Sequence, residues 1–328
     1  MSFAGSDLGA VVLRPALPGG HADGNGRSDG RWARGRVVAR LRDLAELTKA
    51  RLSALVLVTV GAGFLLAGGG ALAQLIGAVL GAGLAALGAG ALNQWWEVEH
   101  DRRMLRTRAR PLPAGRMASG EALAVGLGLS LAGPLLVAAV AGPLPALLTV
   151  ATGALYVLAY TPLKRRTPLS LIPGALVGAL PPLIGWSAAG APLSEGAWFL
   201  FAVLVLWQVP HVVAIDWVHR EDYGRGGYKT FSRRDPSGRT NGALAAFGSA
   251  ALALVSLSGP SAGLGGPISA PISSIVGLLL GGVLFGFAVH FRLTRTTEAA
   301  QRLFLVSLIH LPLLLILLVL ESGTVTRL

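Results

Sequence analysis

Two acidic clusters are the residues best suited to chemistry in this sequence, because aspartate and glutamate are scarce: 16 among 328 residues. The first cluster comprises Asn93, Glu97 and Asp101, each four residues from the next. On a helix, these side chains fall within an arc of about 80°. An amide and two carboxylates in a row form an all-oxygen ligand set, which suits Mg²⁺ bridging to phosphate. The alternative is a polar helix end solvated at a membrane surface.

The second cluster follows a long apolar run, and its members are Asp216, Glu221, Asp222 and Asp235. His211 lies inside that run, where an ionisable side chain indicates a functional site by default. The alternative is a neutral histidine hydrogen-bonded between helices. Six basic residues between Arg102 and Arg116 follow the first cluster at once. The excess of basic residues in cytosolic loops of membrane proteins explains their number. Some of them could also bind a metal-bound diphosphate, which needs cationic donors.

The elements that position both clusters are apolar helices long enough to cross a bilayer. Hydrophobic residues make up 53% of the chain, and charged residues make up 13%, against about 25% charged in an ordinary soluble domain. The runs 52–73 and 123–160 contain no charged residue, whereas about 20 apolar residues suffice for one crossing. This pattern excludes a soluble globular protein and lacks the alternation of a membrane β-barrel. We therefore predict an all-α polytopic membrane protein.

Hydropathy predicts about nine transmembrane helices. Their limits are 50–68, 71–95, 121–140, 144–160, 169–189, 196–218, 242–258, 274–291 and 301–320. We expect residues 1–45 to form a disordered, basic cytosolic tail and residues 46–328 to form one membrane domain. With the N-terminus inside, every lysine and arginine except Arg327 falls in an inner segment, as the positive-inside rule requires. Both acidic clusters then lie at the cytosolic face.

The overall charge and the cysteine count exclude further classes of function. The net charge of +12 is explained by the inner loops, so we predict no nucleic-acid partner. The chain has no cysteine, which excludes disulfides, thiolate metal sites and a cysteine nucleophile.

A series of motifs, in order over roughly 47–320, resembles the UbiA-type intramembrane prenyltransferases and, within them, the protoheme IX farnesyltransferase (heme O synthase) family. The motifs are the run 91–113, with Asn-Gln-Trp-Trp-Glu-Val-Glu-His-Asp at 93–101, then Tyr-Thr-Pro-Leu-Lys-Arg at 160–165, Gly-Ala-Leu-Pro-Pro-Leu-Ile-Gly-Trp at 178–186, Trp-Gln-Val-Pro-His at 207–211, Arg-Glu-Asp-Tyr-Gly-Arg-Gly-Gly-Tyr at 220–228, and Ser-Leu-Ile-His-Leu-Pro at 307–312. The resemblance implies helices around a central cavity that opens to the cytosol.

The resemblance also implies roles for particular residues. Asn93, Glu97 and Asp101 match the first Mg²⁺–diphosphate site, and Asp222 matches a second metal site. Arg106 and Lys164 match cationic positions of the family and complete the expected catalytic set. The expected substrate-binding residues are Lys49, Arg51, Arg110, Tyr160, His211, Arg220 and Glu221.

The sequence departs from the family pattern in places. Glu97 stands where aspartate is common, and Val218 occupies the earlier position of the second acidic site. Ala50 replaces the proline of a Lys-Pro-Arg motif, and Ser170 stands where asparagine is usual. These departures concern individual roles rather than the family likeness.

The activity implied by the resemblance is Mg²⁺-dependent transfer of a farnesyl group from farnesyl diphosphate to a vinyl group of heme B, which gives heme O. The expected partners are these two substrates, the lipid bilayer and a downstream heme A synthase or terminal oxidase assembly. The expected location is a bacterial cytoplasmic (inner) membrane, with the mitochondrial inner membrane as the alternative. Two other functions stay open: a prenyltransferase of the same superfamily acting on a quinone or chlorophyll precursor, and an ion-coupled transporter. A transporter would place its charged groups near the bilayer midplane.

Overall fold

The protein is described by a computed structural model that covers residues 28–259, 262–264 and 270–322, and in these ranges all regular structure is helical. The long helices are α1 (Ser28–Leu47), α2 (Ala50–Leu66), α3 (Leu72–Asp101), α4 (Ser119–Ala141), α9 (Glu195–Val218), α12 (Arg239–Ser256), α13 (Ala270–Thr294) and α14 (Thr297–Glu321). Shorter pieces join into two further rods. One consists of α5 (Pro143–Ala154), the π-helix η1 (Leu155–Tyr160) and α6 (Thr161–Leu163), and the other of η2 (Pro168–Ser170), α7 (Leu171–Ala179) and α8 (Pro181–Ala188).

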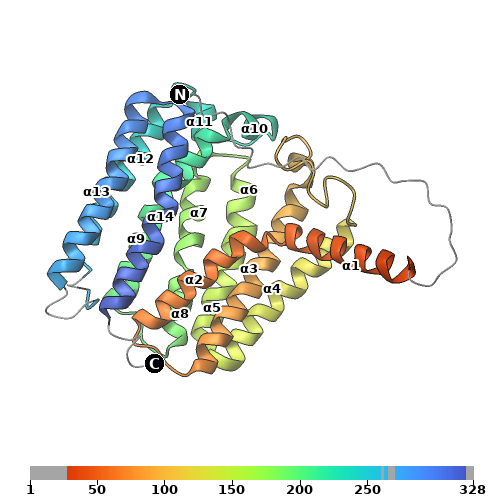
Figure 1. The fold of residues 1–328 in the computed structure, drawn as a ribbon, viewed down its shortest axis with the longest axis horizontal. Helices are drawn as coiled ribbons and strands as arrows, with labels where there is room; N and C mark the ends of the chain where they lie inside the picture. Colours follow the sequence, from red (N-terminus) through yellow and green to blue (C-terminus); the bar gives the residue numbers. More distant parts are fainter. Residues whose placement is uncertain (1–27, 260–261, 265–269, 323–328) are drawn as a thin grey trace.

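The rods are arranged as two groups with a central layer between them (Figure 1). Helices α9, α12, α13 and α14 form one group, and α3, α4 and α5 form the other, while α2 and α8 lie between. The short helices α10 (Arg220–Arg225) and α11 (Phe231–Arg234) connect α9 to α12 at one end of the bundle. The bundle therefore surrounds a centre that side chains from both groups can reach.

Small residues allow the rods to approach closely where they cross. A Cβ atom on Gly133 of α4 would lie 2.6 Å from the backbone nitrogen of Ala85 in α3, and one on Gly63 of α2 would collide with the Pro182 carbonyl oxygen of α8. Such contacts are typical of membrane helices, in which association depends on close van der Waals packing. The glycine-rich composition therefore fixes the distance between the helices that carry the site.

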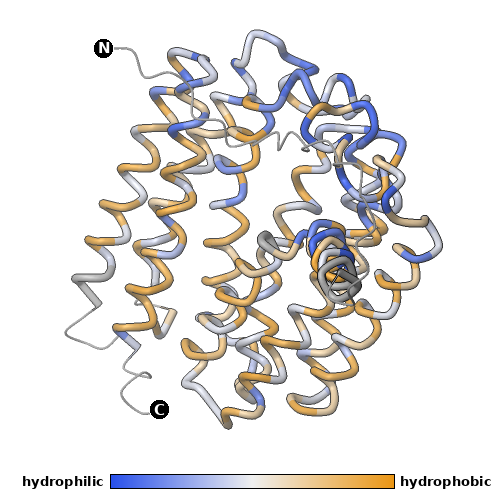
Figure 2. The backbone as a smooth tube through the Cα atoms, turned by 45° about the vertical axis from the view of Figure 1, so that its right-hand side comes forward, coloured by the Kyte–Doolittle hydropathy of each residue, from blue (hydrophilic) through white to orange (hydrophobic). Residues whose placement is uncertain are grey.

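The predicted spans agree with the helices that the structure describes. Seven helices or rods are long and apolar enough to cross a membrane, and α2 contributes a shorter apolar stretch, Ser53–Leu66. Together with α12, these elements occupy all nine predicted positions, so the all-α polytopic class is confirmed. The number of membrane spans is approximate, because α2 and α12 are not among the seven long apolar helices or rods. Hydrophilic residues gather at the upper end in Figure 2, near α6, α10 and α11. We call this the polar end.

The last part of the predicted 1–45 tail is helical. Residues 28–45 belong to α1, which projects from the side of the bundle in Figure 1, whereas residues 1–27 lie outside the described residues. The helix is held at its C-terminal end, because Leu47 is fully buried among side chains of α3 and α4. In addition, Arg116 pairs with Asp43 at 2.9 Å and with Glu46 at 3.0 Å. These partners are distant in sequence, so composition alone could not predict them.

Candidate active site

The last turns of α3 carry the first acidic cluster into the interior of the protein. Asn93, Glu97 and Asp101 share one face, as their spacing predicted, and they are 0%, 3% and 1% exposed. Glu99 points the other way, since its side chain is 65% exposed and pairs with Arg102 at 2.6 Å. One helical face therefore holds two buried carboxylates and an amide at the polar end.

Each member of this row contacts a basic side chain from another part of the chain. The Lys164 ammonium lies 2.8 Å from a carboxylate oxygen of Glu97, and the Arg110 guanidinium lies 2.7 Å from Asp101. Lys49 donates a hydrogen bond of 2.5 Å to Asn93 Oδ1. Lys164 and Arg110 thus balance the two carboxylates, and Lys49 adds a third basic side chain that can donate hydrogen bonds to an anionic ligand.

The two lysines have different electrostatic surroundings. Burial, together with the charges of Arg110 and Lys164, lowers the pKa of Lys49 to about 7. Burial would also lower the pKa of Lys164, but the Glu97 carboxylate outweighs this effect and raises it well above the usual value. Lys49 also has a left-handed backbone, with φ of 54° at the start of α2. Such a conformation is unfavourable for lysine and is frequent at functional sites.

Tyrosines and a threonine complete the cluster. Tyr156 and Tyr160 stack with centroids 5.5 Å apart in the π-helix η1, and Lys49 donates to the Tyr156 hydroxyl at 3.2 Å. The Lys164 ammonium lies 5.0 Å from the ring centroids of both Tyr160 and Tyr228. Thr161 accepts a 2.9 Å hydrogen bond from the Asn93 amide.

No role was predicted from the sequence for Tyr156, Thr161 or Tyr228. One signal could have indicated Tyr156, because it lies one helical turn before Tyr160 in an otherwise apolar span. The contacts of Thr161 and Tyr228 join segments that are distant in sequence.

Asp222 of the second acidic cluster bonds the segment that directly follows the first cluster. Asp222 accepts hydrogen bonds from the backbone amides of Leu105 and Arg106, at 3.2 and 3.3 Å, and pairs with Arg225 at 2.9 Å. Burial would raise the pKa of Asp222. The two amides and the Arg225 guanidinium outweigh this effect of burial and hold the pKa of Asp222 below its usual value. Asp222 thus ties the segment after α3 to α10.

The other expected site residues are dispersed around this connection. The Arg106 guanidinium lies 4.7 Å from the centroid of the Tyr223 ring. Arg220 donates to the Trp217 carbonyl and to Thr297, and Glu221 is 77% exposed. The side chain of Arg51 lies outside the described residues.

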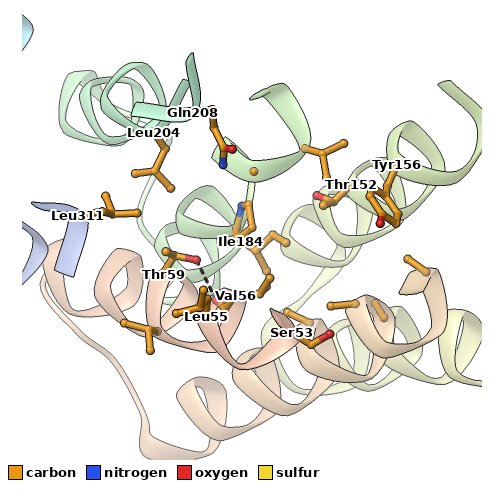
Figure 3. A pocket seen from close by; sticks show the side chains of 18 of the residues that line it. Ser53, Leu55, Val56, Thr59, Thr152, Tyr156, Ile184, Leu204, Gln208 and Leu311 are labelled. Atoms are coloured by element: carbon orange, nitrogen blue, oxygen red, sulfur yellow. Dashed lines mark hydrogen bonds between the residues drawn. The ribbon is translucent and has the colours of Figure 1, made fainter. Parts of the chain in front are cut away.

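A cavity of about 330 Å³ leads from the cluster into the bundle. Lys49 and Tyr156 line one part of it, and Gln208 and His211 of α9 line another. The remaining wall is largely apolar, with side chains from α2, α3, α5, α8, α9 and α14. Figure 3 shows Leu55, Val56, Thr59, Thr152, Ile184, Leu204 and Leu311 around this space. The site therefore combines a charged end with an apolar chamber.

The donor set of the first cluster fits a hard divalent cation. Among the described residues, no group of three or more histidine, cysteine, aspartate or glutamate side chains could hold a metal ion by itself. The first cluster instead offers two buried carboxylates and an amide, all oxygen donors. Mg²⁺ is commonly held in this way, by one or two carboxylates, while waters and substrate phosphates fill the remaining positions.

The family model described as the UbiA prenyltransferase family matches residues 55–311, so the chain belongs to that family. The first motif, the cationic residues around it and the apolar chamber lie within the matched range, apart from Lys49, Ser53, Pro312 and Leu315.

Within this family, the chain is similar to proteins with one particular name. It is 39% identical over 293 residues to a protoheme IX farnesyltransferase of Solibacter usitatus, covering 86% of this chain and 99% of the relative. The predicted family likeness is therefore confirmed, and the transporter alternative is wrong.

Solved structures show the same fold at low sequence identity. A structure of digeranylgeranylglyceryl phosphate synthase matches with a TM-score of 0.68 and 16% identity, covering 87% of this chain and 99% of that protein. A UbiA homologue from Archaeoglobus fulgidus, solved bound to GPP and Mg²⁺, matches with a TM-score of 0.58 and 15% identity, covering 84% and 99%. The fold class is thus confirmed by geometry as well as by sequence.

Proposed function

We propose that this protein transfers the farnesyl group of farnesyl diphosphate to a vinyl group of heme B, giving heme O. The observation that carries the proposal is the continuity between the charged cluster and the apolar cavity. Lys49 belongs to both, because it bonds Asn93 and lines the chamber that extends to His211. A diphosphate with a long hydrocarbon tail needs such a charged end beside an apolar space. The likeness to protoheme IX farnesyltransferases supports heme B as the acceptor.

The residues of the cluster would bind the diphosphate and stabilise its departure. Asn93, Glu97 and Asp101 would hold Mg²⁺, which supplies positive charge to the leaving group. Lys49, Lys164 and Arg110 would donate hydrogen bonds to the diphosphate oxygens. Breaking the C1–O bond leaves an allylic cation, and the stacked faces of Tyr156 and Tyr160 beside the site favour positive charge.

The reaction is completed at the porphyrin edge. The vinyl group supplies its electron pair to farnesyl C1, so a carbon–carbon bond forms and positive charge moves to the carbon next to the ring. Water adds there and loses a proton, which gives the hydroxyethylfarnesyl side chain. The apolar chamber excludes bulk water from the earlier cation and so limits its hydrolysis.

The orientation in the membrane is part of the proposal. We infer that the polar end faces the cytosol, because the basic segments 102–116, 164–166 and 220–239 gather there. We place the protein in a bacterial cytoplasmic membrane, with residues 46–328 as the catalytic domain and α1 docked against it. Reporter fusions after Gly69 and within 102–116 should report opposite sides, and an outer signal from 102–116 would contradict the orientation. We also propose that a heme A synthase or terminal oxidase assembly takes up the product.

The decisive experiment supplies the purified protein, in lipid nanodiscs, with farnesyl diphosphate and heme B. We expect Mg²⁺-dependent formation of heme O, measured by chromatography and mass spectrometry. Parallel reactions replace heme B with an aromatic quinone precursor and with a chlorophyll precursor. Prenylation of one of these precursors without reaction at heme B would contradict the proposed acceptor while preserving the prenyltransferase class.

A further inference from the structure

His211 is the ionisable side chain in the wall of the apolar cavity that the proposed mechanism leaves without a role. It lies in α9, where the Trp207 ring stacks on its imidazole at 4.5 Å between centroids. Phe304 of α14 packs against the same ring at 5.1 Å. The imidazole is therefore held in one orientation by aromatic neighbours on two helices, and it borders the chamber.

The hydrogen bonds of Ser307 determine which imidazole nitrogen carries the proton. The Ser307 hydroxyl donates to the Phe304 carbonyl at 2.6 Å, one helical turn earlier, so its single proton is used there. His211 Nδ1 lies 2.9 Å from the same hydroxyl oxygen. Because this oxygen can then only accept, Nδ1 must carry the hydrogen and donate it. Nε2 is left with a lone pair, and within the described part of the chain no hydrogen-bond partner of Nε2 is found.

This arrangement matches that of a histidine prepared to bind a metal. Metal-binding histidines almost always donate their other ring N–H to an oxygen, which fixes the tautomer and the orientation of the ring. Here the oxygen is Ser307 Oγ. A neutral histidine nitrogen is also a common axial ligand of heme iron.

The depth of His211 agrees with such a role. Asn93 lies eight residues before Asp101, the last residue of α3, and His211 lies seven residues before Val218, the last residue of α9. At a rise of 1.5 Å per residue, both lie about 10–12 Å from the end of their helix. His211 and Asn93 therefore lie at a similar depth from the helix ends, and the cavity that Lys49 lines beside Asn93 also reaches His211.

We propose that His211 Nε2 binds the iron of the heme B substrate as an axial ligand and so positions the acceptor vinyl group. This inference rests on the proposed function, because it assumes that heme B is the acceptor. His310 of α14 is the competing histidine, but it is 3% exposed and does not line the cavity. His310 therefore provides a matched control on a neighbouring helix.

The test uses the purified full-length protein in nanodiscs, with ferrous heme B and nitric oxide as a spectroscopic probe. A histidine trans to the nitrosyl adds nitrogen hyperfine splitting to the electron paramagnetic resonance spectrum. We expect this splitting in the parent and in His310→Gln. We expect its loss in His211→Gly and its return when imidazole is added. Splitting that persists in His211→Gly, that disappears in His310→Gln, or that is absent from the parent would overturn the assignment.

A second variant keeps the test decisive if His211→Gly does not fold. Ser307→Ala removes the acceptor of the Nδ1 proton but leaves His211 in place. We expect heme affinity to fall about 10–100-fold, the usual effect of losing such a supporting contact, with the nitrogen splitting retained. Unchanged heme affinity in Ser307→Ala would contradict the arrangement.

The two proposals can fail separately. A parent protein that makes heme O but lacks the histidine signature would refute only the axial ligand. A parent protein that neither binds heme B nor farnesylates it would refute the proposed function itself.

Discussion

Replacing Asp101 by asparagine tests the acidic row most directly, because the change removes a charge while preserving shape. Asp101 is 1% exposed, and its carboxylate pairs with Arg110 at 2.7 Å. We expect the rate of farnesyl transfer to fall about 10²–10³-fold, the loss seen when one preorganised electrostatic contact is removed from a transition state. In free energy, this equals about 2.7–4 kcal/mol.

The stability effect of the same change can be separated from the catalytic one. Loss of a fully buried partner costs about 3–5 kcal/mol, and an exposed ion pair is worth about 0–1 kcal/mol. Arg110 is 24% exposed, so solvent can stabilise it after Asp101→Asn, and we expect a value between these limits. Thermal unfolding in detergent measures this term, and initial rates at saturating Mg²⁺ and at matched protein levels measure catalysis.

Glu99→Gln is the matched control, because it makes the same chemical change two residues away on the same helix. Its side chain is 65% exposed and contacts Arg102 rather than the cluster. We expect a change in rate of less than about threefold, consistent with the small energy of an exposed pair. Equal losses of activity in Asp101→Asn and Glu99→Gln would refute the argument that one helical face forms the site.

Three further predictions test the diphosphate contacts, the packing and the metal. Arg110→Lys should lower the transfer rate at least about tenfold, since lysine cannot reproduce the planar guanidinium that donates to Asp101 at 2.7 Å. Arg108→Lys, exposed in the same segment, should stay near the parent value. Gly63→Ala should lower the free energy of unfolding by about 1–3 kcal/mol through overpacking against α8, whereas Gly61→Ala, with open space around it, should be neutral or stabilising in thermal unfolding. Chelation of divalent cations should stop heme O formation, and added Mg²⁺ should restore it. Undiminished transfer in excess chelator would contradict the metal role.

The sequence was sufficient to predict the features that depend on local periodicity. Uncharged apolar runs predicted the helical rods, and four-residue spacing predicted the shared face of Asn93, Glu97 and Asp101. Both properties follow from the geometry of one helix, so neighbours along the chain are enough to reveal them.

The features that were missed depend on contacts between distant segments. The docking of α1 requires Arg116 to reach Asp43 and Glu46, and the position of Asp222 requires amides more than a hundred residues away in the chain. Tyr156 belongs to the site because Lys49, at the start of α2, donates a hydrogen bond to its hydroxyl. A periodic pattern within one segment does not predict contacts with a distant segment.

The π-helix η1 makes the site sensitive to the length of the chain. Its wider turn lies between the membrane-buried part of α5 and Lys164, so it sets the direction in which Tyr156, Tyr160 and Lys164 leave the rod. A single deleted residue in an α-helix rotates everything beyond it by about 100°. A one-residue deletion in α5 would leave the span long and apolar enough to insert, but would turn the Lys164 ammonium away from Glu97. A change in the length of this rod should therefore still allow membrane insertion but should abolish farnesyl transfer.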